Sequence, residues 1–335
     1  MMTPSAYPLV SIIMPVKDCG EYLEAAVSSL ISQDYPNIEI IIIDDGTQDN
    51  SLNDIPNLNN IRLIKNHGQG IVSALNTGIA MARGEYIARM DGDDVALSHR
   101  ISTQINYLME NPEIGIAGAQ VEIIHSSEVG AGYLRYKDWI NALLTPDAIQ
   151  HAIFVESPVP HPTAIFRRDV FKAIGHYHET VWPEDYDLWL RAYQAGIRIG
   201  KPEGILFQWR DHSGRLSRVD NRYTNKQFIQ AKACYLSQTL LRQRKVAIWG
   251  TGPNGITLFD ALKEYGVFVD VFIDIHPRRI GGQKRGRHVL SHEHISALKG
   301  HIILIAVASL GARPEIHKFL YEQNMQEGHD YIFTA

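Results

Sequence analysis

Three carboxylates lie within four positions of this sequence, at Asp91, Asp93 and Asp94. The apolar run 86–88 predicts a strand that ends just before them, and Gly92 allows a sharp turn. Alternate side chains of an extended segment point to the same side, so Asp91 and Asp93 should converge. Converging carboxylates repel each other unless a positive charge lies between them, and a divalent cation such as Mg²⁺ or Mn²⁺ suits that position. A solvated acidic turn fits the same residues, and this motif by itself leaves both interpretations open.

A second pair of carboxylates, Glu184 and Asp185, follows Trp182 and opens a segment with apolar residues at helical spacing. A carboxylate at the start of a helix is favoured by the helix dipole and by the unpaired N–H groups there. Asp185 therefore has a structural explanation as a helix cap, beside a chemical one as a general base.

The elements that must position these carboxylates alternate between strands and helices. The predicted strands are 10–15, 38–43, 61–64 and 85–88, and the predicted helices are 22–32 and 70–82. This alternation predicts an α/β protein with a parallel sheet covered on both faces, in which ligands bind beyond the carboxyl ends of the strands. Pro15, Asp44, Asp45 and Asp91 follow three of these ends, so we expect them to meet at one edge.

The middle of the chain continues the α/β pattern with weaker signals. Further predicted elements are a helix at 100–110, a strand at 114–124, a helix near 139–144, a strand at 204–208 and a helix from 221 to 243. The segment 125–156 is the least informative part of this region.

Composition bounds the class of protein. The chain has 335 residues, enough for one large domain or two ordinary ones, and 45% hydrophobic residues, as in soluble globular proteins. A net charge of -5 gives no reason to expect a nucleic-acid partner. Two cysteines, Cys19 and Cys234, fit a reducing compartment. We expect no signal peptide and no membrane-spanning segment.

The last third of the sequence predicts a second α/β unit. Gly250, Gly252 and Gly255 form a G-x-G-x-x-G pattern between a strand at 245–249 and a helix, and Asp274 ends the next strand. This unit resembles half of a Rossmann-type fold and lacks an evident catalytic pair for hydride transfer. Ligand binding, a structural role and an assembly role all remain open for it, and the basic loop 278–287 is equally compatible with a solvated surface.

Several segments, taken in order, resemble the family 2 inverting glycosyltransferases, which have the GT-A fold. The matching segments are 10–16, 43–47, 74–79, 89–94, 161–163 and 184–191. Each segment is a weak signal alone, and their order and spacing make the resemblance specific. It covers roughly the first two-thirds of the chain.

The resemblance implies roles for the donor side. Pro15 and Val16 would line the base pocket, and Asp44 or Asp45 would accept a hydrogen bond from the base, although Asp44 and Asp45 also suit a simple turn. Asp93 would hold the metal. The remaining donor-side residues would be Asp91, on the ribose, a metal-bound water or the metal itself, with Gly70 and Asn76. Arg89 fits either the motif or a buried ion pair.

The resemblance also implies roles around the acceptor. Asp185 would be the general base, and the acceptor-side residues would be Glu184, His161 and Trp182. His161 fits a core histidine equally well. His212 would be a third metal ligand or contact the diphosphate, with a polar loop as the alternative. Arg210, Arg215 and Arg218 would offer donors to phosphate oxygens.

These interpretations combine into one prediction for the chain. Residues 1–220 would form a GT-A glycosyltransferase domain, 221–243 a connecting helix and 244–335 a small Rossmann-like domain. The enzyme would use Mn²⁺ or Mg²⁺ and a nucleotide sugar, expected to be a UDP-sugar, to glycosylate a glycan or glycolipid of a surface polysaccharide, with inversion.

Three further expectations accompany that prediction. The location would be cytoplasmic, with peripheral contact at the inner face of the membrane and homo-oligomer formation left open. Two other classes also remain open. One is an NAD(P)-dependent oxidoreductase built on the C-terminal glycine loop, and the other is a non-catalytic nucleotide-sugar-binding protein.

Overall fold

The computed structural model describes residues 7–125 and 130–335, which form two compact units. The first unit contains the residues up to Gln150, Pro158–Thr180 and Arg191–Val219. The second contains His151–Ser157, Val181–Leu190 and Asp220–Ala335. The chain thus passes between the units several times, and the predicted domain limits at 220 and 243 stay predictions.

A seven-stranded sheet forms the centre of the first unit, in the order β3-β2-β1-β4-β8-β6-β9. Its strands are β1 (Val10–Val16), β2 (Ile38–Asp44), β3 (Ile61–Lys65), β4 (Tyr86–Arg89), β6 (Ile114–Ala117), β8 (Ile165–Arg167) and β9 (Arg198–Gly200). The four strands predicted before residue 90 are confirmed. The sheet is mixed rather than purely parallel, because β8 runs antiparallel to both β4 and β6. An apolar run does not indicate the direction of a strand. The sequence pattern therefore could not predict that β8 is antiparallel to its neighbours.

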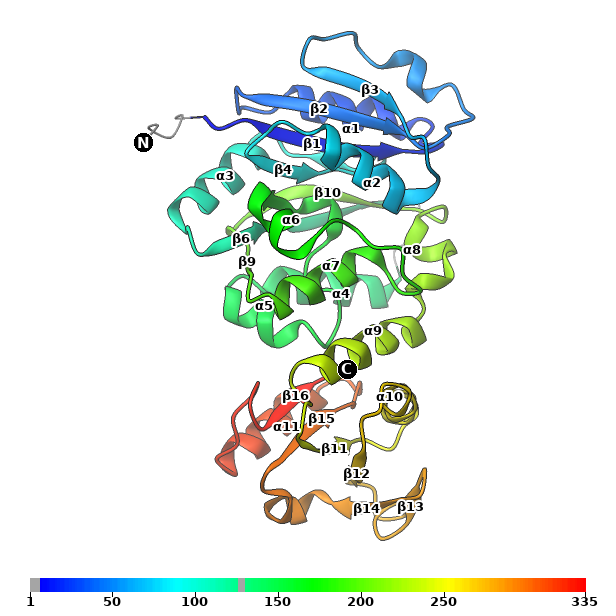
Figure 1. Ribbon diagram of the computed structural model, residues 1–335, viewed down its shortest axis with the longest axis vertical. Coiled ribbons are helices and arrows are strands. Elements are labelled where there is room, and N and C mark those ends of the chain that lie inside the picture. Colours follow the sequence, from blue (N-terminus) through cyan, green and yellow to red (C-terminus); the bar gives the residue numbers. More distant parts are fainter. Residues whose placement is uncertain (1–6, 126–129) are drawn as a thin grey trace. The chain divides into compact units, whose positions relative to one another are not determined.

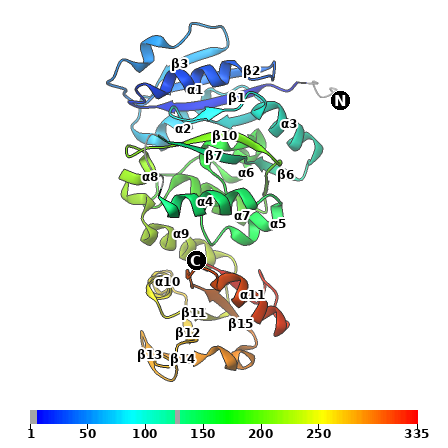
Figure 2. The ribbon, with the colours of Figure 1, turned by 180° about the vertical axis from the view of Figure 1, so that it is seen from behind.

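Alternate residues of the central strands face opposite layers, as the pleat of a strand requires. One face packs Val10, Ile12 and Met14 against helices α1 (Tyr22–Ile31) and α3 (Arg100–Glu110). The other face is covered by α2 (Gly70–Met81), where the missing side chain of Gly78 admits Ile13, since a Cβ there would lie 2.3 Å from Ile13 Cγ2. Figures 1 and 2 show α1 and α2 on opposite sides of β1.

A smaller sheet in the order β5-β10-β7 adds to the first unit. Its strands are β5 (Val95–Ala96), β7 (Gln120–His125) and β10 (Ile205–Asp211). The single strand predicted at 114–124 is therefore wrong, because β6 and β7 belong to different sheets. The break falls at Gly118, whose N–H donates to the Gly200 carbonyl at 2.9 Å and where a Cβ would lie 2.7 Å from Val159 Cγ1.

The remaining elements up to residue 238 are helices and 3-10 turns. They are η1 (Ser51–Asp54), α4 (Ala131–Ala142), α5 (Pro146–Ala152), η2 (His161–Thr163), α6 (Arg168–Ile174), α7 (Glu184–Gln194), α8 (Leu216–Val219), η3 (Asn221–Tyr223) and α9 (Asn225–Gln238). The long helix predicted from 221 to 243 is divided into η3 and α9. The acceptor-side segment beginning at His161 is the 3-10 turn η2 followed by β8. Across the part of the chain that the structure describes, no helix has both the length and the apolar character needed to cross a bilayer.

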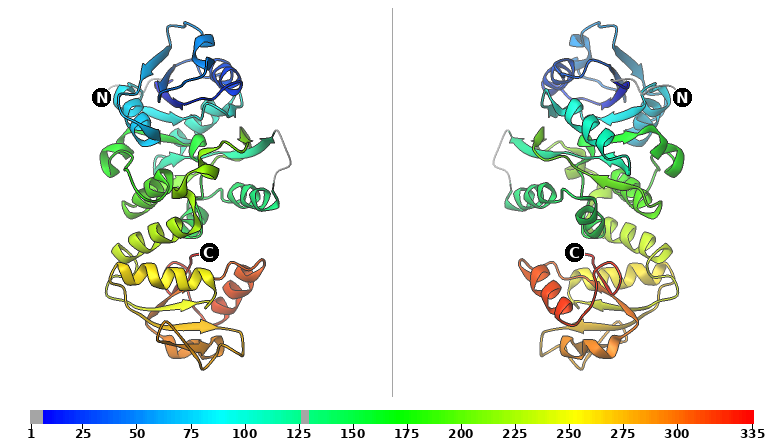
Figure 3. Two further views of the ribbon diagram at one scale, coloured as in Figure 1. Left: turned by 90° about the vertical axis from the view of Figure 1, so that its right-hand side faces the viewer. Right: turned by 90° about the vertical axis from the view of Figure 1, so that its left-hand side faces the viewer.

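The second unit contains a six-stranded sheet in the order β13-β14-β12-β11-β15-β16. Its elements are β11 (Lys245–Trp249), α10 (Pro253–Glu264), β12 (Val269–Asp274), β13 (Gln283–Lys284), β14 (Arg287–Ser291), η4 (His292–Leu298), β15 (His301–Ile305), α11 (Ala312–Glu322) and β16 (Tyr331–Phe333). All its pairings are parallel except that of β13 with β14. Figure 3 shows α10 in yellow and α11 in red-orange beside these strands. The predicted Rossmann-like sheet is confirmed.

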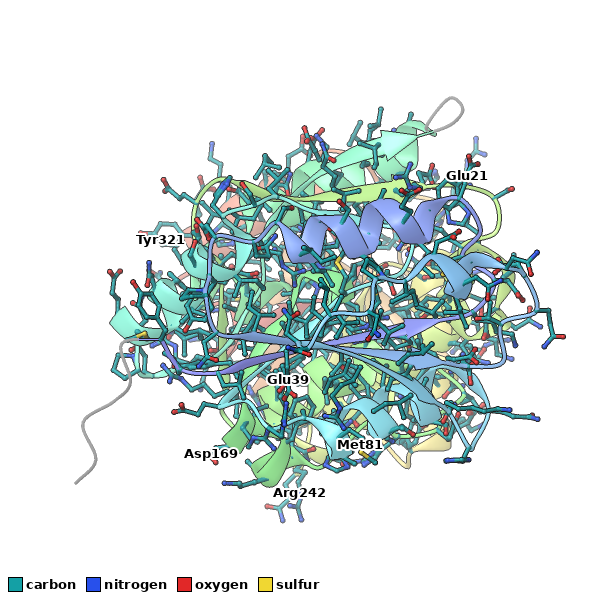
Figure 4. The ribbon with its side chains drawn as sticks, turned by 90° about the horizontal axis from the view of Figure 1, so that it is seen from above. Glu21, Glu39, Met81, Asp169, Arg242 and Tyr321 are labelled. Atoms are coloured by element: carbon teal, nitrogen blue, oxygen red, sulfur yellow. The ribbon has the colours of Figure 1, made fainter. Side chains whose placement is uncertain are left out.

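A buried carboxylate, Glu39, links β1, β2 and the turn before β4 at the amino end of the first sheet. Glu39, labelled on β2 in Figure 4, has a side chain that is only 3% exposed. It accepts hydrogen bonds from Ser11 Oγ at 2.6 Å and from the Arg83 backbone N–H at 2.7 Å, and it pairs with the Arg83 guanidinium at 2.7 Å. Burial alone would raise the pKa of Glu39, but these bonds outweigh it and hold the pKa below its usual value. Glu39 thus joins β1, β2 and the turn before β4.

We expect Glu39→Gln to lower the free energy of unfolding by about 2 kcal/mol, because it removes the charge from a buried carboxylate that accepts several hydrogen bonds. A carboxylate with a lowered pKa stabilises the fold above its unfolded pKa, and this stabilisation is lost as pH falls. The difference between wild type and variant should therefore shrink as pH falls below 4.5, the ordinary glutamate value. Urea unfolding across this pH range measures it. The exposed neighbour Glu85 provides the control, and an equal loss in Glu85→Gln would contradict the account.

Candidate functional site

The predicted edge of the first sheet is formed by the carboxyl ends of β2, β1 and β4. These strands are neighbours and parallel, with Val16 opposite Asp44 and Ile13 opposite Arg89. The Asp45 N–H donates to the Val16 carbonyl at 2.9 Å, which joins two of the strand ends directly. The sheet therefore brings Pro15, Val16, Asp44, Asp45 and the motif at 89–94 to one edge, as expected.

The turn after β4 depends on the absence of a side chain at Gly92. A Cβ at this position would lie 2.7 Å from Cys19 Sγ and 3.4 Å from Val16 Cγ2. Gly92 therefore allows the acidic motif to approach the end of β1 closely. This close approach, more than a special backbone angle, explains the glycine.

Three carboxylates converge at this turn. Oxygen atoms of Asp91, Asp93 and Asp94 lie within 4.8 Å of one another. The sequence predicted Asp91 and Asp93 as a pair, whereas Asp94 is an addition that the structure supplies. The alternation of side chains along a strand would have sent Asp94 away from the other two, and the turn at Gly92 cancels that alternation.

Basic side chains surround the three carboxylates. Arg89 pairs with Asp91 at 2.6 Å, which makes it the buried ion-pair partner that the sequence left open. Arg215 lies 3.7 Å from Asp91 and 3.5 Å from Asp94. His212 Nε2 is hydrogen-bonded to Asp93 Oδ2 at 2.8 Å. Arg89 and Arg215 thus bring two guanidinium groups to the three carboxylates.

Asp94 is fully buried, and this sets it apart from Asp91 and Asp93. Burial raises the pKa of Asp94; Arg215 lowers it, and the charges of Asp93 and Asp91 raise it further. Its Oδ1 accepts from the Arg210 backbone N–H at 2.7 Å, while Oδ2 has no hydrogen-bond partner among the residues that the structure describes. A buried carboxylate oxygen without a partner is costly, so this atom calls for a cation or a proton.

The segment after β10 is held against the acidic motif by several contacts. The Arg210 guanidinium donates to the Asp93 carbonyl at 2.6 Å and lies over the Tyr22 ring, 4.5 Å from its centroid. Arg215 stacks on Trp209 at 4.9 Å. Arg218, in contrast, forms a two-pronged pair with Asp211 at 2.6 Å. The three arginines predicted to face phosphate therefore already have protein partners, and their role toward a ligand stays a prediction.

The donor set at this edge fits a hard divalent cation. Carboxylate oxygens from three residues are close together, one of them lacks a partner, and an imidazole adjoins the group. A divalent ion would add two positive charges at this edge, which would favour a diphosphate. Asp93, Asp91 and His212 remain the predicted ligands, and Asp94 joins them as a candidate.

The two aspartates after β2 have different surroundings. Asp44 Oδ1 accepts from the N–H groups of Gly46 and Thr47 at 3.0 and 2.8 Å, which is the turn that the sequence offered as an alternative. Asp45 Oδ1 accepts from Asn66 Nδ2 at 2.6 Å and from the Gly70 N–H at 3.1 Å. Each aspartate thus has one oxygen occupied by two hydrogen bonds, and contact of Asp44 or Asp45 with a base stays a prediction.

Two other predicted donor-side residues have structural contacts. Gly70 begins α2 with a φ of 83°, a conformation that favours glycine. Asn76 exchanges two hydrogen bonds with the Tyr177 backbone, at 2.9 and 3.0 Å. These contacts explain both residue types, and their roles in donor binding stay predictions.

His161 lies in a buried pair with Tyr177. Its Nε2 is 2.7 Å from the Tyr177 hydroxyl. Burial lowers the pKa of His161 well below its usual value, with a smaller contribution from Arg89, so the ring is neutral. This arrangement matches the core histidine that the sequence analysis left open, and an acceptor-side role is untested.

The Glu184–Asp185 pair lies in the second unit, at the start of α7. Glu184 is 1% exposed and accepts from the Tyr223 hydroxyl, while Asp185 Oδ1 accepts from the Tyr186 N–H at 2.7 Å. Burial raises the pKa of Asp185 to about 8, and the neighbouring Glu184 charge adds to this. Trp182 Nε1 donates to Asp187 at 3.0 Å. Asp185 is therefore both near a helix start and electrostatically unlike an ordinary cap.

The C-terminal glycine loop has the backbone geometry of a Rossmann turn. Gly250 has a φ of 114°, and a Cβ on Gly255 would lie 1.9 Å from the Gly250 carbonyl oxygen. Asp274, predicted as a ribose-binding acid, is buried and accepts from Thr251, from the His276 N–H at 2.9 Å and from Arg279 at 3.1 Å. Those bonds occupy the carboxylate, and a ligand role for the loop stays untested.

The basic loop 278–287 contains several paired side chains. Besides Arg279, Arg285 pairs with Asp260 at 2.6 Å and Arg287 stacks on Phe268 at 4.0 Å. These contacts favour the structural interpretation of the loop over an anion site.

Comparison with known proteins agrees with this geometry. The family model named Glycosyl transferase family 2 matches residues 11–175. An uncharacterized glycosyltransferase of Haemophilus influenzae is 32% identical over 229 residues, which cover 65% of this chain and 70% of that protein. The Escherichia coli protein WfaP, named as a UDP-Glc:alpha-D-GlcNAc-diphosphoundecaprenol beta-1,3-glucosyltransferase, is 30% identical, covering 62% of this chain and 80% of WfaP.

Solved structures are similar in fold. Staphylococcus aureus TarS 1-349 in complex with UDP-GlcNAc superimposes with a TM-score of 0.55 at 16% identity, covering 78% of this chain and 73% of that chain. At this identity the likeness shows the fold alone.

We expect Asp93→Ala to abolish Mn²⁺-dependent binding of UDP, because it removes one of the three carboxylates that would bind the cation. His212→Ala should weaken the same binding more mildly. Isothermal titration calorimetry with UDP, with Mn²⁺ or with EDTA, measures both effects. Asp147→Ala is the control, because Asp147 is an exposed carboxylate paired with Arg198. Unchanged UDP affinity of the wild type in EDTA would remove the metal site from the account.

The glycine loop yields a prediction about stability. Gly255→Ala should lower the melting temperature, because its Cβ would meet a backbone carbonyl that cannot move aside. Gly252→Ser should fold normally, since a Cβ there has nothing within 4 Å and serine is a good helix cap. Differential scanning calorimetry of both variants compares them. Equal melting temperatures would show that close packing at Gly255 is unimportant.

Proposed function

This chain belongs to glycosyl transferase family 2, and from that membership we propose that it moves a hexosyl group from a UDP-sugar to a hydroxyl of a lipid-linked glycan, with inversion. The protein is a glycosyltransferase that uses a nucleotide-sugar donor. The observation that carries the finer proposal is the convergence of Asp91, Asp93 and Asp94 at the carboxyl edge of the sheet.

The donor would bind along the ends of β1, β2 and β4. Pro15 and Val16 at the end of β1 would lie beside the base, and Asp45 would accept a hydrogen bond from its N–H. Asp91 would accept from a ribose hydroxyl. Support for uridine comes from the relatives, since WfaP is named for UDP-Glc and TarS was solved with UDP-GlcNAc.

A divalent cation would be held by Asp93 and Asp91, with His212 and Asp94 beside them. When bound, such an ion supplies positive charge next to the diphosphate and stabilises it as a leaving group. Positively charged side chains of the protein would also stabilise the diphosphate. Arg215 already bridges two of the carboxylates, so it would be held near the diphosphate without further ordering.

Asp185 would be the general base. In the proposed step the acceptor oxygen forms a bond to the anomeric carbon, the bond from that carbon to the diphosphate oxygen breaks, and the acceptor proton moves to Asp185. The raised pKa of Asp185, about 8, supports this role, because a base is most effective when its pKa lies near the working pH. The base must be ionised, so transfer should increase as pH rises toward 8.

The acceptor class and location complete the proposal. WfaP is named for a diphosphoundecaprenol-linked acceptor, and AmsE of Erwinia amylovora is named for amylovoran biosynthesis. We infer by analogy a lipid-linked acceptor in surface polysaccharide synthesis, used at the cytoplasmic face of the membrane. The two free cysteines, Cys19 and Cys234, are compatible with a reducing compartment.

We expect Asp185→Asn to reduce transfer by about a hundredfold or more while donor binding stays within a few-fold, because only proton abstraction is lost. Release of UDP from a UDP-glucose and UDP-GlcNAc panel, with lipid-linked GlcNAc as acceptor, measures transfer. Calorimetry measures donor binding.

A matched control is available on the same helix. Asp187 accepts from Trp182 Nε1 and from the Tyr235 hydroxyl at 2.8 Å, and asparagine at this position keeps an accepting oxygen. Asp187→Asn should therefore retain transfer within a few-fold. Near-normal transfer by Asp185→Asn would reduce Asp185 to a helix cap.

A further inference from the structure

The carboxylate next to Asp185 is held by residues that sequence analysis did not single out. The Tyr223 hydroxyl lies 3.1 Å from both oxygens of Glu184, and Arg222 Nη1 lies 3.7 Å from Glu184 Oε2. Both residues belong to η3, 38 and 39 positions after Glu184 in the sequence. Glu184 is therefore fixed as a hydrogen-bond acceptor beside Asp185.

Arg222 is itself oriented by Asp220. Asp220 accepts from the Arg222 backbone N–H at 2.8 Å and from its guanidinium at 2.9 and 2.7 Å. These bonds leave Nη1 directed toward Glu184. The turn η3 thus presents one hydroxyl and one positive charge to a single buried carboxylate.

We propose that Tyr223, supported by Arg222, is a positioning residue for Asp185, which acts by holding Glu184 as an ionised neighbour. The proposal rests on the assignment of Asp185 as the base. Two buried carboxylates next to each other share protons, and the proton resides on the one whose charge is less well stabilised. The contacts of Glu184 favour the charge there, so the proton resides on Asp185.

Two further charged groups act on this pair. Glu156, in the same unit, also raises the pKa of Asp185, and its own pKa is raised by burial and lowered by Lys232. Lys232 Nζ donates to the carbonyls of Val155 and Thr334 at 2.8 and 3.1 Å. Burial raises the pKa of Tyr223 well above its usual value, with Glu184 and Asp185 adding to it, so Tyr223 stays protonated as a donor.

The direction of each effect follows from this arrangement. Without the Tyr223 hydroxyl, Glu184 takes a larger share of the proton, and Asp185 ionises at lower pH. Without the Glu184 charge, Asp185 loses its nearest like-charged neighbour and again ionises at lower pH. Removal of either group therefore lowers the pH at which Asp185 ionises, although the Tyr223 hydroxyl donates to Glu184 and not to Asp185.

The test is a titration of Asp185 in the full-length protein. Aspartate labelled with ¹³C at the carboxyl carbon is followed by NMR from pH 4 to 10, and the Asp185 signal is the one missing in Asp185→Asn. We expect its midpoint to fall by about one pH unit in Glu184→Gln and by about half a unit in Tyr223→Phe. The low-pH limb of the transfer rate should move by the same amounts.

Tyr235→Phe is the matched control, because Tyr235 donates to Asp187 on the same helix at 2.8 Å and is not part of the Glu184 contacts. It should leave the Asp185 midpoint unchanged. Equal midpoints in wild type, Tyr223→Phe and Glu184→Gln would overturn the inference. If Tyr223→Phe does not fold, Arg222→Gln takes its place and should also lower the midpoint, because it removes the positive charge 3.7 Å from Glu184.

The outcomes separate this inference from the proposed function. Loss of transfer in Asp185→Asn together with unshifted midpoints overturns the inference alone. Shifted midpoints together with normal transfer in Asp185→Asn overturn the role of Asp185 as base, while the electrostatic coupling between Tyr223, Glu184 and Asp185 stands.

Discussion

The convergence of three carboxylates beyond β4 is the constraint on which the rest of the first unit depends. Two like charges about 4 Å apart cost roughly 4 kcal/mol at an effective dielectric constant of about 20, so such a cluster needs compensation. Arg89 supplies part of it from the motif itself, and Arg215 supplies the rest from a segment more than a hundred positions later. The pairs of Arg215 with Asp91 and Asp94 hold the segment after β10 against the carboxylates that would bind the cation. The same contacts hold Arg215 beside Asp91 and Asp94, where the proposed function would place a diphosphate.

Much of the arrangement at this edge of the sheet could be predicted, because it follows from short segments of the sequence. Apolar runs at β1, β2 and β4 end in Pro15, Asp44 and Arg89, and parallel strands bring their ends together. The convergence of Asp94 with Asp91 and Asp93 was not predictable, since it depends on the turn at Gly92. The pairing of Glu184 with Tyr223 was equally hidden, because nothing in a single sequence relates two residues that are 39 positions apart. The division of 114–124 into two strands likewise depends on contacts with Val159 and Gly200, which are distant in the sequence.

The two groups of carboxylates have different electrostatic environments. In the first unit, carboxylates are neutralised by arginines and would accept a cation. In the second unit, Asp185 lies beside Glu184 and Glu156, and its pKa is raised rather than lowered. A leaving diphosphate requires the first environment, and a base that takes a proton near neutral pH requires the second. The C-terminal glycine loop belongs to neither group, since Asp274 is occupied by Thr251 and Arg279.

The central claim is that the carboxylates at the end of β4 bind a metal ion together with the nucleotide. Crystals grown with Mn²⁺ and UDP, measured near the manganese absorption edge, test it most directly through the anomalous difference map. We expect one strong peak in direct contact with an Asp93 oxygen, with the uracil beside Asp45 and the diphosphate on the side of Arg215. A map in which UDP occupies the edge without any peak at Asp91 or Asp93, or in which UDP binds elsewhere on the protein, would contradict it.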